Sequence, residues 1–205
     1  MVYLAKDSDF EKLRGYWIYK GQEKEVEIPE YINGELVTNT VYMFSPFFDA
    51  TPVSKVVLNN KNVTDVSFTF KGYSIDQHLD LSSFDTTNVT NMSSMFGGYS
   101  SSQPLDLSSF DTRNVTNMRN IFNDVDNLEE IYTRTKEDAE KLKLYVSSYG
   151  ISPKFYYKEK EKIDFEATFG KLALGDYEIE NIYFKDNNGN LNELMIYKDK
   201  ITELQ

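Results

Sequence analysis

The chain has 205 residues, of which 40% are hydrophobic and 15% aromatic, a composition typical of a folded protein. Its net charge of -11 disfavours nucleic acids and anionic membranes as partners, because binding to phosphate groups requires a concentrated basic surface. It has no cysteine, which excludes disulfides, thiolate metal ligands and a cysteine nucleophile. We also expect no membrane insertion, and the first residues lack the pattern of an export signal.

Residues 1–36 predict an N-terminal cap, with a hairpin and a lead-in to the segment that follows. The stretch RGYWIYKGQEKEVEIPEYING, from 14 to 34, alternates apolar and polar residues and favours a hairpin that turns near Gly21. Ile28-Pro29 predicts the end of a strand, and Asn33-Gly34 predicts a turn.

One stretch of the sequence then occurs twice. LDLSSFDTTNVTNMSSMF, at 79–96, returns as LDLSSFDTRNVTNMRNIF at 105–122, a step of 26 residues. Repetition with a period of 20 to 50 residues is typical of a solenoid, whose units bury their apolar sides only by stacking on one another. We therefore predict that residues 37–133 form a solenoid of four coils, with units near 37–44, 63–70, 89–96 and 115–122. The same step defines a valine column and a phenylalanine column, which are Val37, Val63, Val89 and Val115, and Phe44, Phe70, Phe96 and Phe122.

Each unit predicts a strand followed by a short helical turn, and hence an α/β fold class. In LDLSSF the alternation of Leu79, Leu81 and Phe84 indicates a short strand, which consecutive units should pair into a small parallel sheet. In NVTNMSSMF the residues Val89, Met92 and Phe96 stand at i, i+3 and i+7, as on one face of a helical turn. The same strand pattern recurs at Leu105, Leu107 and Phe110, and more weakly at Val56 and Leu58.

Two columns of polar residues repeat with the same step. They are Asn62, Asn88 and Asn114, and Asn39, Asp65, Asn91 and Asn117. Side chains of Asn and Asp bond the backbone in turns, so we interpret both columns as structural, bonding their own turn or the next coil. The alternative is N-glycosylation, because Asn62, Asn88, Asn91 and Asn114 each begin an N-x-[ST] motif. The repeat alone produces these motifs, however, and no export signal accompanies them.

At these residues the chain resembles the BspA-like leucine-rich repeat family, a repeat also met in mycoplasmal lipoproteins and Gram-positive surface proteins. The family's unit is similar to LDLSSFDTTNVTNMSSMF followed by a Gly-Cys-Ser segment, where this chain has GGYSSS at 97–102 with Tyr99 at the cysteine position. The lead-in VEIPEYINGELVT, at 26–38, is also similar to the family's first coil. The resemblance implies a leucine-rich-repeat-like solenoid with terminal caps, surface attachment or partner recognition, and no catalysis.

Residues 134–152 predict a helix that closes the last coil. Thr135 with Asp138 indicates a helix start, Ala139, Leu142, Val146 and Tyr149 mark an apolar face, and Gly150 fits the stop.

Residues 153–205 predict a separate small antiparallel β unit. The stretches KFYYKEKEKIDFEATF, YEIENIYF and NELMIYK read as strands, the last two joined by a loop that carries Asn188-Gly189. Gly189 is misplaced for an EF-hand calcium loop, so we expect a hairpin turn and no cofactor. This part has a weak likeness to hairpin units of phage tail and baseplate proteins, and we expect that it could form a homo-oligomer.

The sequence carries little that could support catalysis. His78 is the single histidine, and no phosphate-binding loop, nucleophile motif or dinucleotide fingerprint is present, so we expect no enzyme activity. Candidate binding residues are the repeated acids Asp80 and Asp106, and Asp85 and Asp111, together with Tyr99. Stacked acids also favour solubility, which is the plainer interpretation of these columns.

The function hypothesis is a non-enzymatic recognition or adhesion protein that binds a protein or a cell-surface glycan through the solenoid. Its setting would be a bacterial cell surface or, since no export signal is seen, a phage or phage-like tail. One alternative is an intracellular acidic inhibitor or scaffold that occupies a basic groove of a host protein. The other is a carbohydrate-binding module.

Overall fold

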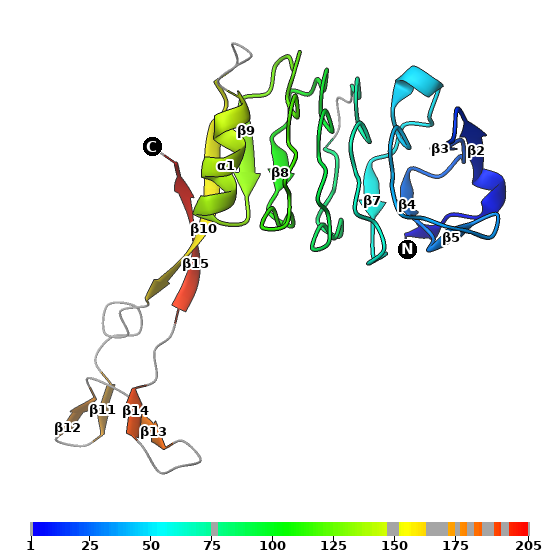
Figure 1. Ribbon diagram of the computed structural model, residues 1–205. Helices are drawn as coiled ribbons and strands as arrows, with labels where there is room; N and C mark the ends of the chain where they lie inside the picture. Colours follow the sequence, from blue (N-terminus) through cyan, green and yellow to red (C-terminus); the bar gives the residue numbers. More distant parts are fainter. Residues whose placement is uncertain are drawn as a thin grey trace. The chain divides into compact units, whose positions relative to one another are not determined.

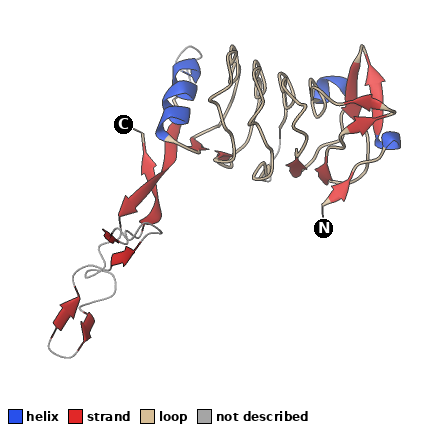
Figure 2. Cartoon of the chain, turned by 60° about the horizontal axis from the view of Figure 1, so that its bottom comes forward, coloured by secondary structure: helices blue, strands red, loops and turns tan. Residues whose placement is uncertain are grey.

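A computed structural model describes residues 2–74, 78–146, 152–162, 172–174, 177–179, 183–185, 191–193 and 197–204. Contacts divide the chain into two compact units, one of Met1–Tyr157 with Thr202–Gln205 and one of Lys158–Ile201. In the described residues the structure is mixed α/β, with mostly short strands, one α-helix and parallel sheets (Figure 2). None of the described helices has the length and apolarity needed to cross a membrane.

The first unit begins with two short hairpins and a strand that joins a parallel sheet. The N-terminal strands are β1 (Tyr3–Leu4), β2 (Phe10–Leu13), β3 (Tyr16–Tyr19), β4 (Glu25–Glu27), β5 (Tyr31–Ile32) and β6 (Glu35–Leu36), with a 3-10 turn, η1 (Asp7–Asp9), between β1 and β2. The β2–β3 and β5–β6 pairs are antiparallel, whereas β4 lies between β1 and β7 (Lys55–Val57) and runs parallel to both.

The predicted turn at Asn33-Gly34 is confirmed, and the predicted hairpin turn near Gly21 is wrong. Asn33 and Gly34 have positive φ angles of 50° and 77° and connect β5 to β6. The first hairpin turns instead at Arg14 and Gly15, whose φ angles are 51° and 89°. The strand after Gly21 is β4, which pairs with the distant β7 and thereby enters the parallel stack.

Consecutive copies of the 26-residue repeat lie side by side and share backbone bridges (Figure 1). One row of parallel bridges joins Asn39 to Asp65, Asp65 to Asn91, and Asn91 to Asn117. In the strand halves, β7 and β8 (Leu105–Leu107) are regular strands, while the copy between them contributes single bridges from Asp80 and Phe84 to the repeat before it. The predicted parallel pairing is thus confirmed for the strand halves at 55–58 and 80–84, through single bridges, and β8 pairs in parallel with β9 (Glu130–Thr133) after the last repeat.

The second half of each repeat is not a helical turn, which corrects the sequence prediction. The backbone follows successive tight turns, such as Met95 N to Met92 O at 3.2 Å and Gly97 N to Ser94 O at 3.1 Å. A left-handed residue interrupts any right-handed helix at the same place in every copy, namely Tyr42, Phe68, Ser94 and Asn120, with φ between 52° and 61°. The amide of Phe96 bonds the carbonyl of Ile121 in the next copy at 3.0 Å, where a helix would bond it within its own turn.

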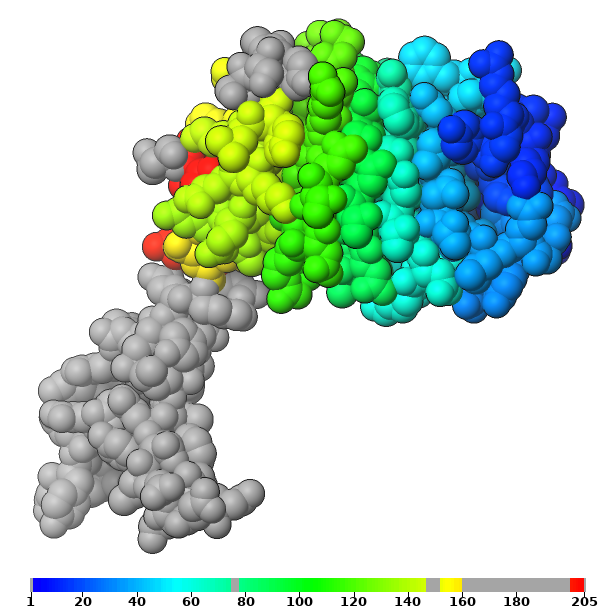
Figure 3. Space-filling model, in the orientation of Figure 1, coloured from blue at the N-terminus to red at the C-terminus, as the bar shows by residue number. Residues whose placement is uncertain are grey.

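The interior of the first unit is a column of stacked aromatic rings. Phe44, Phe70, Phe96 and Phe122 are all buried, and their ring centroids are spaced 5.6, 5.8 and 6.0 Å apart with interplanar angles of 14° or less. A shorter stack joins Phe84 to Phe110 at 5.7 Å. The valine column, Val37, Val63, Val89 and Val115, is also buried. In the space-filling view the successive repeats form adjacent bands in contact, from blue to green (Figure 3).

A sheet and a helix follow the last repeat. The sheet has the order β15 (Tyr197–Glu203), β10 (Lys154–Lys162), β9 (Glu130–Thr133) and β8. Helix α1 (Lys136–Val146) begins as predicted, because the Thr135 hydroxyl accepts a bond from Asp138 N at 3.2 Å. The predicted continuation through Tyr149 to Gly150 lies outside the described residues.

The boundary that we predicted at residue 153 differs from the division by contacts. Phe155 and Tyr157, on β10, are buried in the core of the first unit, and Leu204 N bonds Phe155 O at 2.7 Å. The second unit contains two antiparallel pairs, of β11 (Leu172–Leu174) with β12 (Tyr177–Ile179) and of β13 (Tyr183–Lys185) with β14 (Leu191–Glu193). Asn188-Gly189 lies between β13 and β14, outside the described residues.

Candidate functional site

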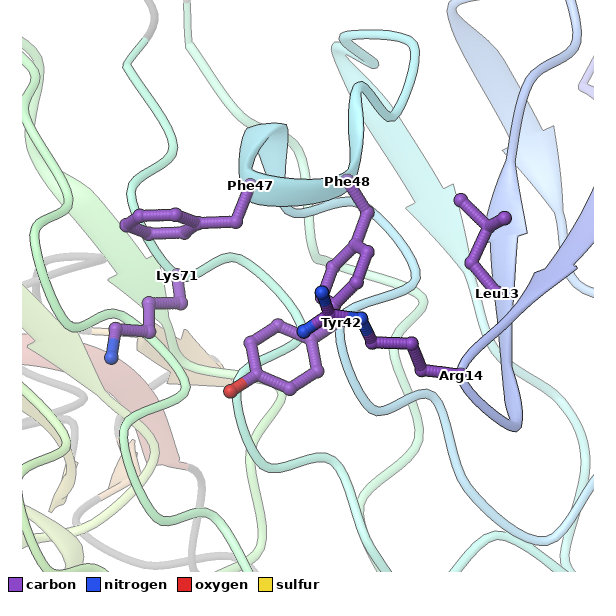
Figure 4. A pocket seen from close by; sticks show the side chains of 6 residues that line it. All are labelled: Leu13, Arg14, Tyr42, Phe47, Phe48 and Lys71. Carbon is purple, nitrogen blue, oxygen red and sulfur yellow. The ribbon is translucent and has the colours of Figure 1, made fainter.

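A pocket of about 470 Å³ lies in the first unit, where the N-terminal hairpin meets the first two repeats. Three aromatic rings, one leucine and two cations line it (Figure 4); these residues are Leu13, Arg14, Tyr42, Phe47, Phe48 and Lys71. In Figure 4 Phe47 and Phe48 extend from the same short helical turn, and Arg14 reaches toward Phe48 from the hairpin. The lining is therefore apolar, with positive charge on two sides.

The short helical turn η2 (Pro46–Phe48) presents two of these rings. Ser45 caps it by accepting the amide of Phe47 at 3.3 Å, and the same hydroxyl donates to the carbonyl of Lys71 at 2.7 Å. The ammonium of Lys20 donates to the carbonyls of Phe48 and Asp49 at 2.7 and 2.9 Å. These bonds from two other segments hold η2 in place, so the pocket has a fixed rim.

Tyr42 is the centre of an aromatic cluster beneath the pocket. Its ring stacks on Phe68 at 4.8 Å and meets Phe48 and Tyr16 edge-on at 5.1 and 5.5 Å. Burial, and secondarily the neighbouring Tyr16, raises the pKa of Tyr42. The hydroxyl therefore stays protonated at neutral pH and is available as a hydrogen-bond donor.

Phe47 is an exposed aromatic ring that packs over a glycine. Its ring is 67% exposed, the largest value among the exposed aromatic residues of the described chain. A Cβ added at Gly72 would lie 2.8 Å from a Phe47 ring carbon, and Gly72 has a φ of 71°. Glycine at this position thus leaves room for the Phe47 ring, with which a larger residue would clash.

The two cations of the pocket lie over its rings. The Arg14 guanidinium is 5.9 Å from the centroid of Phe48, and the Lys71 ammonium is 5.7 Å from Phe47 and 5.2 Å from Phe68. Within the described part of the chain, neither cation forms an ion pair with a carboxylate. The contrast with the repeated acids is clear, because most of those are paired.

Asp80 and Asp85, two of the predicted binding residues, form ion pairs with the preceding repeat. Asp80 accepts from Lys55 at 2.6 Å and Asp85 accepts from Lys61. Burial opposes ionisation of Asp80, but the bonds from Lys55 and Ser82 outweigh it and lower its pKa to about 2. The pKa of Asp85 is lowered as well, since bonds from Lys61 and Thr87 outweigh its burial. Both carboxylates are thus engaged within the chain.

Asp111 is a structural carboxylate, which corrects its choice as a surface residue. Its side chain is 9% exposed and bonds Arg113 at 2.6 Å and Arg134 at 3.1 Å. The bond from Arg113, followed by those from its backbone and by Arg134, lowers the pKa of Asp111 to about 2. Arg134 also bonds Asp138 of α1 at 3.1 Å, so this network ties the last repeat to the helix.

Tyr99 is likewise a core residue and Asp106 a half-buried one. Tyr99 is 1% exposed and packs edge-on against Phe96 at 5.8 Å, and burial raises its pKa. It therefore fills the interior and offers no binding surface. Asp106 accepts the amide of Ser108 at 2.8 Å, the bond that closes its own turn.

The asparagine columns bond neighbouring repeats. Asn88 donates to the carbonyl of Lys61 at 2.8 Å and Asn114 to that of Thr87 at 2.7 Å, whereas Asn62 donates to Glu30 at 3.2 Å. In the other column Asn91 donates to Asp65 at 2.9 Å. These side chains have structural partners in the stack.

The residues of the pocket have no counterpart among the binding residues predicted from the sequence. The usable signal was the segment after Phe44, where Pro46-Phe47 stands in place of Gly72-Tyr73 and Gly98-Tyr99 of the next two repeats. Both tyrosines are buried, whereas Phe47 is exposed. Among the described residues no group of three or more His, Asp or Glu could hold a metal ion. His78 is exposed.

The family comparison agrees with the repeat region. The family model described as "Mycoplasma protein of unknown function, DUF285" matches residues 38–143, which is more than half of the chain. No match was found among curated proteins or among solved structures.

Proposed function

The chain belongs to this DUF285 family, and on that basis we propose that it is a non-enzymatic recognition protein that binds a partner protein at a bacterial surface. In this proposal residues 37–133 form a leucine-rich-repeat-like solenoid of four coils, capped at both ends and followed by a small β unit. The family's description names Mycoplasma, and the repeats resemble those of bacterial surface proteins, which supports a cellular setting more than a phage tail.

The observation that carries the proposal is the pocket of one exposed ring, Phe47, two half-buried rings, Tyr42 and Phe48, and two cations that have no carboxylate partner in the described residues. Aromatic residues and arginine are enriched in the energetically dominant part of protein interfaces. Here Phe47 and Phe48 stand on η2, which Ser45 and Lys20 fix by hydrogen bonds, and the Arg14 guanidinium lies 5.9 Å from the ring of Phe48. A rigid rim lowers the entropy lost on binding, which favours affinity.

The ion pairs of the repeated acids also favour the pocket, and not the acid columns, as the binding surface. Asp80, Asp85 and Asp111 are neutralised by cations of the chain itself, so they add little to a surface for a basic partner. The stack then serves as the scaffold that positions the pocket.

The test is binding of the biotinylated full chain to an array of displayed cell-surface ectodomains, with a glycan array in parallel. We expect saturable binding to a protein ectodomain that falls at least tenfold in Phe47→Ala. Tyr31→Ala is the matched control, because Tyr31 is also an exposed aromatic residue, at 53%, and does not line the pocket. Binding confined to glycans, or no saturable binding on either array, would overturn the proposal.

A further inference from the structure

We propose that the pocket takes an acidic peptide segment of its partner, with a large apolar side chain among Tyr42, Phe47 and Phe48. Carboxylates on either side of that side chain would bind Arg14 and Lys71. This inference rests on the proposed function and names the ligand class of the same site.

The charges of the pocket favour an anionic ligand. The chain has 33 acids against 22 bases, yet two bases of this pocket have no carboxylate partner in the described residues. Arg14 presents a planar guanidinium that can bind a carboxylate through two parallel bonds, and Lys71 presents a point charge. A cationic ligand would be repelled by both.

The lining favours a peptide over a sugar. A carbohydrate needs acceptors as well as donors for its hydroxyls, whereas no carboxylate or carboxamide side chain is among the described residues that line this pocket. Its polar side-chain groups are two cations and the Tyr42 hydroxyl, and its remaining walls are Leu13, Phe47 and Phe48. Such walls gain free energy mainly by removing apolar surface from water.

The size of the site and the charge of the whole chain favour a short segment. A volume of about 470 Å³ is within the range of pockets that hold small ligands, enough for a large side chain and its neighbours. The net charge of -11 repels an extensively acidic protein at long range. A local motif that reaches the two cations avoids most of that repulsion, since the exposed charges are screened beyond about 10 Å.

The test is a hexapeptide array in which the two central positions run through all amino acids and the flanking positions are Glu, Gln or Lys. We expect the full chain to bind best where an aromatic or large aliphatic centre has Glu flanks, and at least tenfold more weakly where Gln replaces Glu. Arg14→Asn and Lys71→Gln should each reduce binding to the Glu-flanked peptides about fivefold or more, and Phe47→Ala about tenfold. Asn is chosen at position 14 because it tolerates the left-handed backbone of that turn, whose φ is 51°.

Tyr31→Ala again serves as the matched control and should change binding less than twofold. Best binding to Lys- or Gln-flanked peptides, or binding that is indifferent to Arg14→Asn and Lys71→Gln, would overturn this inference. If an ectodomain still bound in a manner sensitive to Phe47→Ala, the ligand class alone would be wrong and the proposed function would stand. If Phe47→Ala had no effect on any ligand, both would be wrong.

Discussion

At the scale of single residues, stacked phenylalanines link each repeat to the next. Phe96 is fully buried between Phe70 and Phe122, with centroid distances of 5.8 and 6.0 Å. Phe96→Ala should lower the free energy of unfolding by about 3–5 kcal/mol, because the ring leaves a cavity that its neighbours cannot fill. Phe47→Ala, which removes an exposed ring, should change it by no more than about 0.5 kcal/mol. Urea unfolding measures both, and equal losses would contradict this description of the core.

A second residue-scale prediction concerns pH. The pKa of Asp111 is lowered to about 2 in the folded chain, so the stability that its charged form provides is present above about pH 4 and is lost as the pH falls toward 2. Asp111→Asn should therefore destabilise the protein by about 1–3 kcal/mol at pH 7, by removing charge-assisted bonds from Arg113 and Arg134. The difference from the wild type should narrow between pH 4 and pH 2. Urea unfolding measures the difference in unfolding free energy between Asp111→Asn and the wild type. If that difference were constant with pH, the charge of Asp111 would not stabilise the fold.

At the scale of elements, glycine and alanine substitutions can distinguish tight turns from a helix in the second half of each repeat. Ser94 has a φ of 52°, a conformation in which glycine is more stable than alanine by about 1 kcal/mol. Ser94→Gly should therefore be more stable than Ser94→Ala. At Glu140, an exposed position of α1, the order should reverse, because alanine is the better helix former by about 1 kcal/mol. Thermal unfolding of the four variants measures these orders of stability. If the alanine variant were the more stable one at both positions, the result would support a helical repeat.

Elements that depend on local sequence were the more predictable ones. The Asn33-Gly34 turn and the start of α1 at Thr135 each depend on residues within four positions of one another. The turns of the repeat were mistaken for a helix because apolar spacing of i, i+3 and i+7 also suits successive tight turns. Only bonds to the next copy, such as Phe96 N to Ile121 O, distinguish the two structures. Such bonds join residues about one repeat apart and leave no mark in the local pattern.

At the scale of the whole molecule, the 26-residue period predicted the stacking of the repeats but not the pocket. The pocket combines Arg14, η2 and Lys71, which come from the N-terminal hairpin and two different repeats. Its residues have no common spacing, so they meet only once the hairpin has packed against the stack. The acid columns had a visible spacing, and their pairing with Lys55 and Lys61 makes them part of the scaffold.

A further prediction at this scale concerns assembly through the second unit. Each of its described sheets has two strands, and an isolated two-stranded sheet is only marginally stable in water. We therefore expect the full chain to form an oligomer in light scattering. A version with residues 163–196 replaced by a short Gly-Ser linker should be monomeric, and it retains Phe155 and Tyr157 in the core of the first unit. A monomeric full chain at high concentration would contradict this expectation.

We expect the partner to contact the aromatic and cationic pocket directly. A photoreactive benzoylphenylalanine at position 47, or at position 31 as the matched control, tests it most directly when the labelled chain is irradiated with the bound ectodomain. We expect a crosslink from position 47, mapped by mass spectrometry to an acidic segment of the partner, and none from position 31. Equal crosslinking from both positions, or crosslinking from position 31 alone, would contradict it.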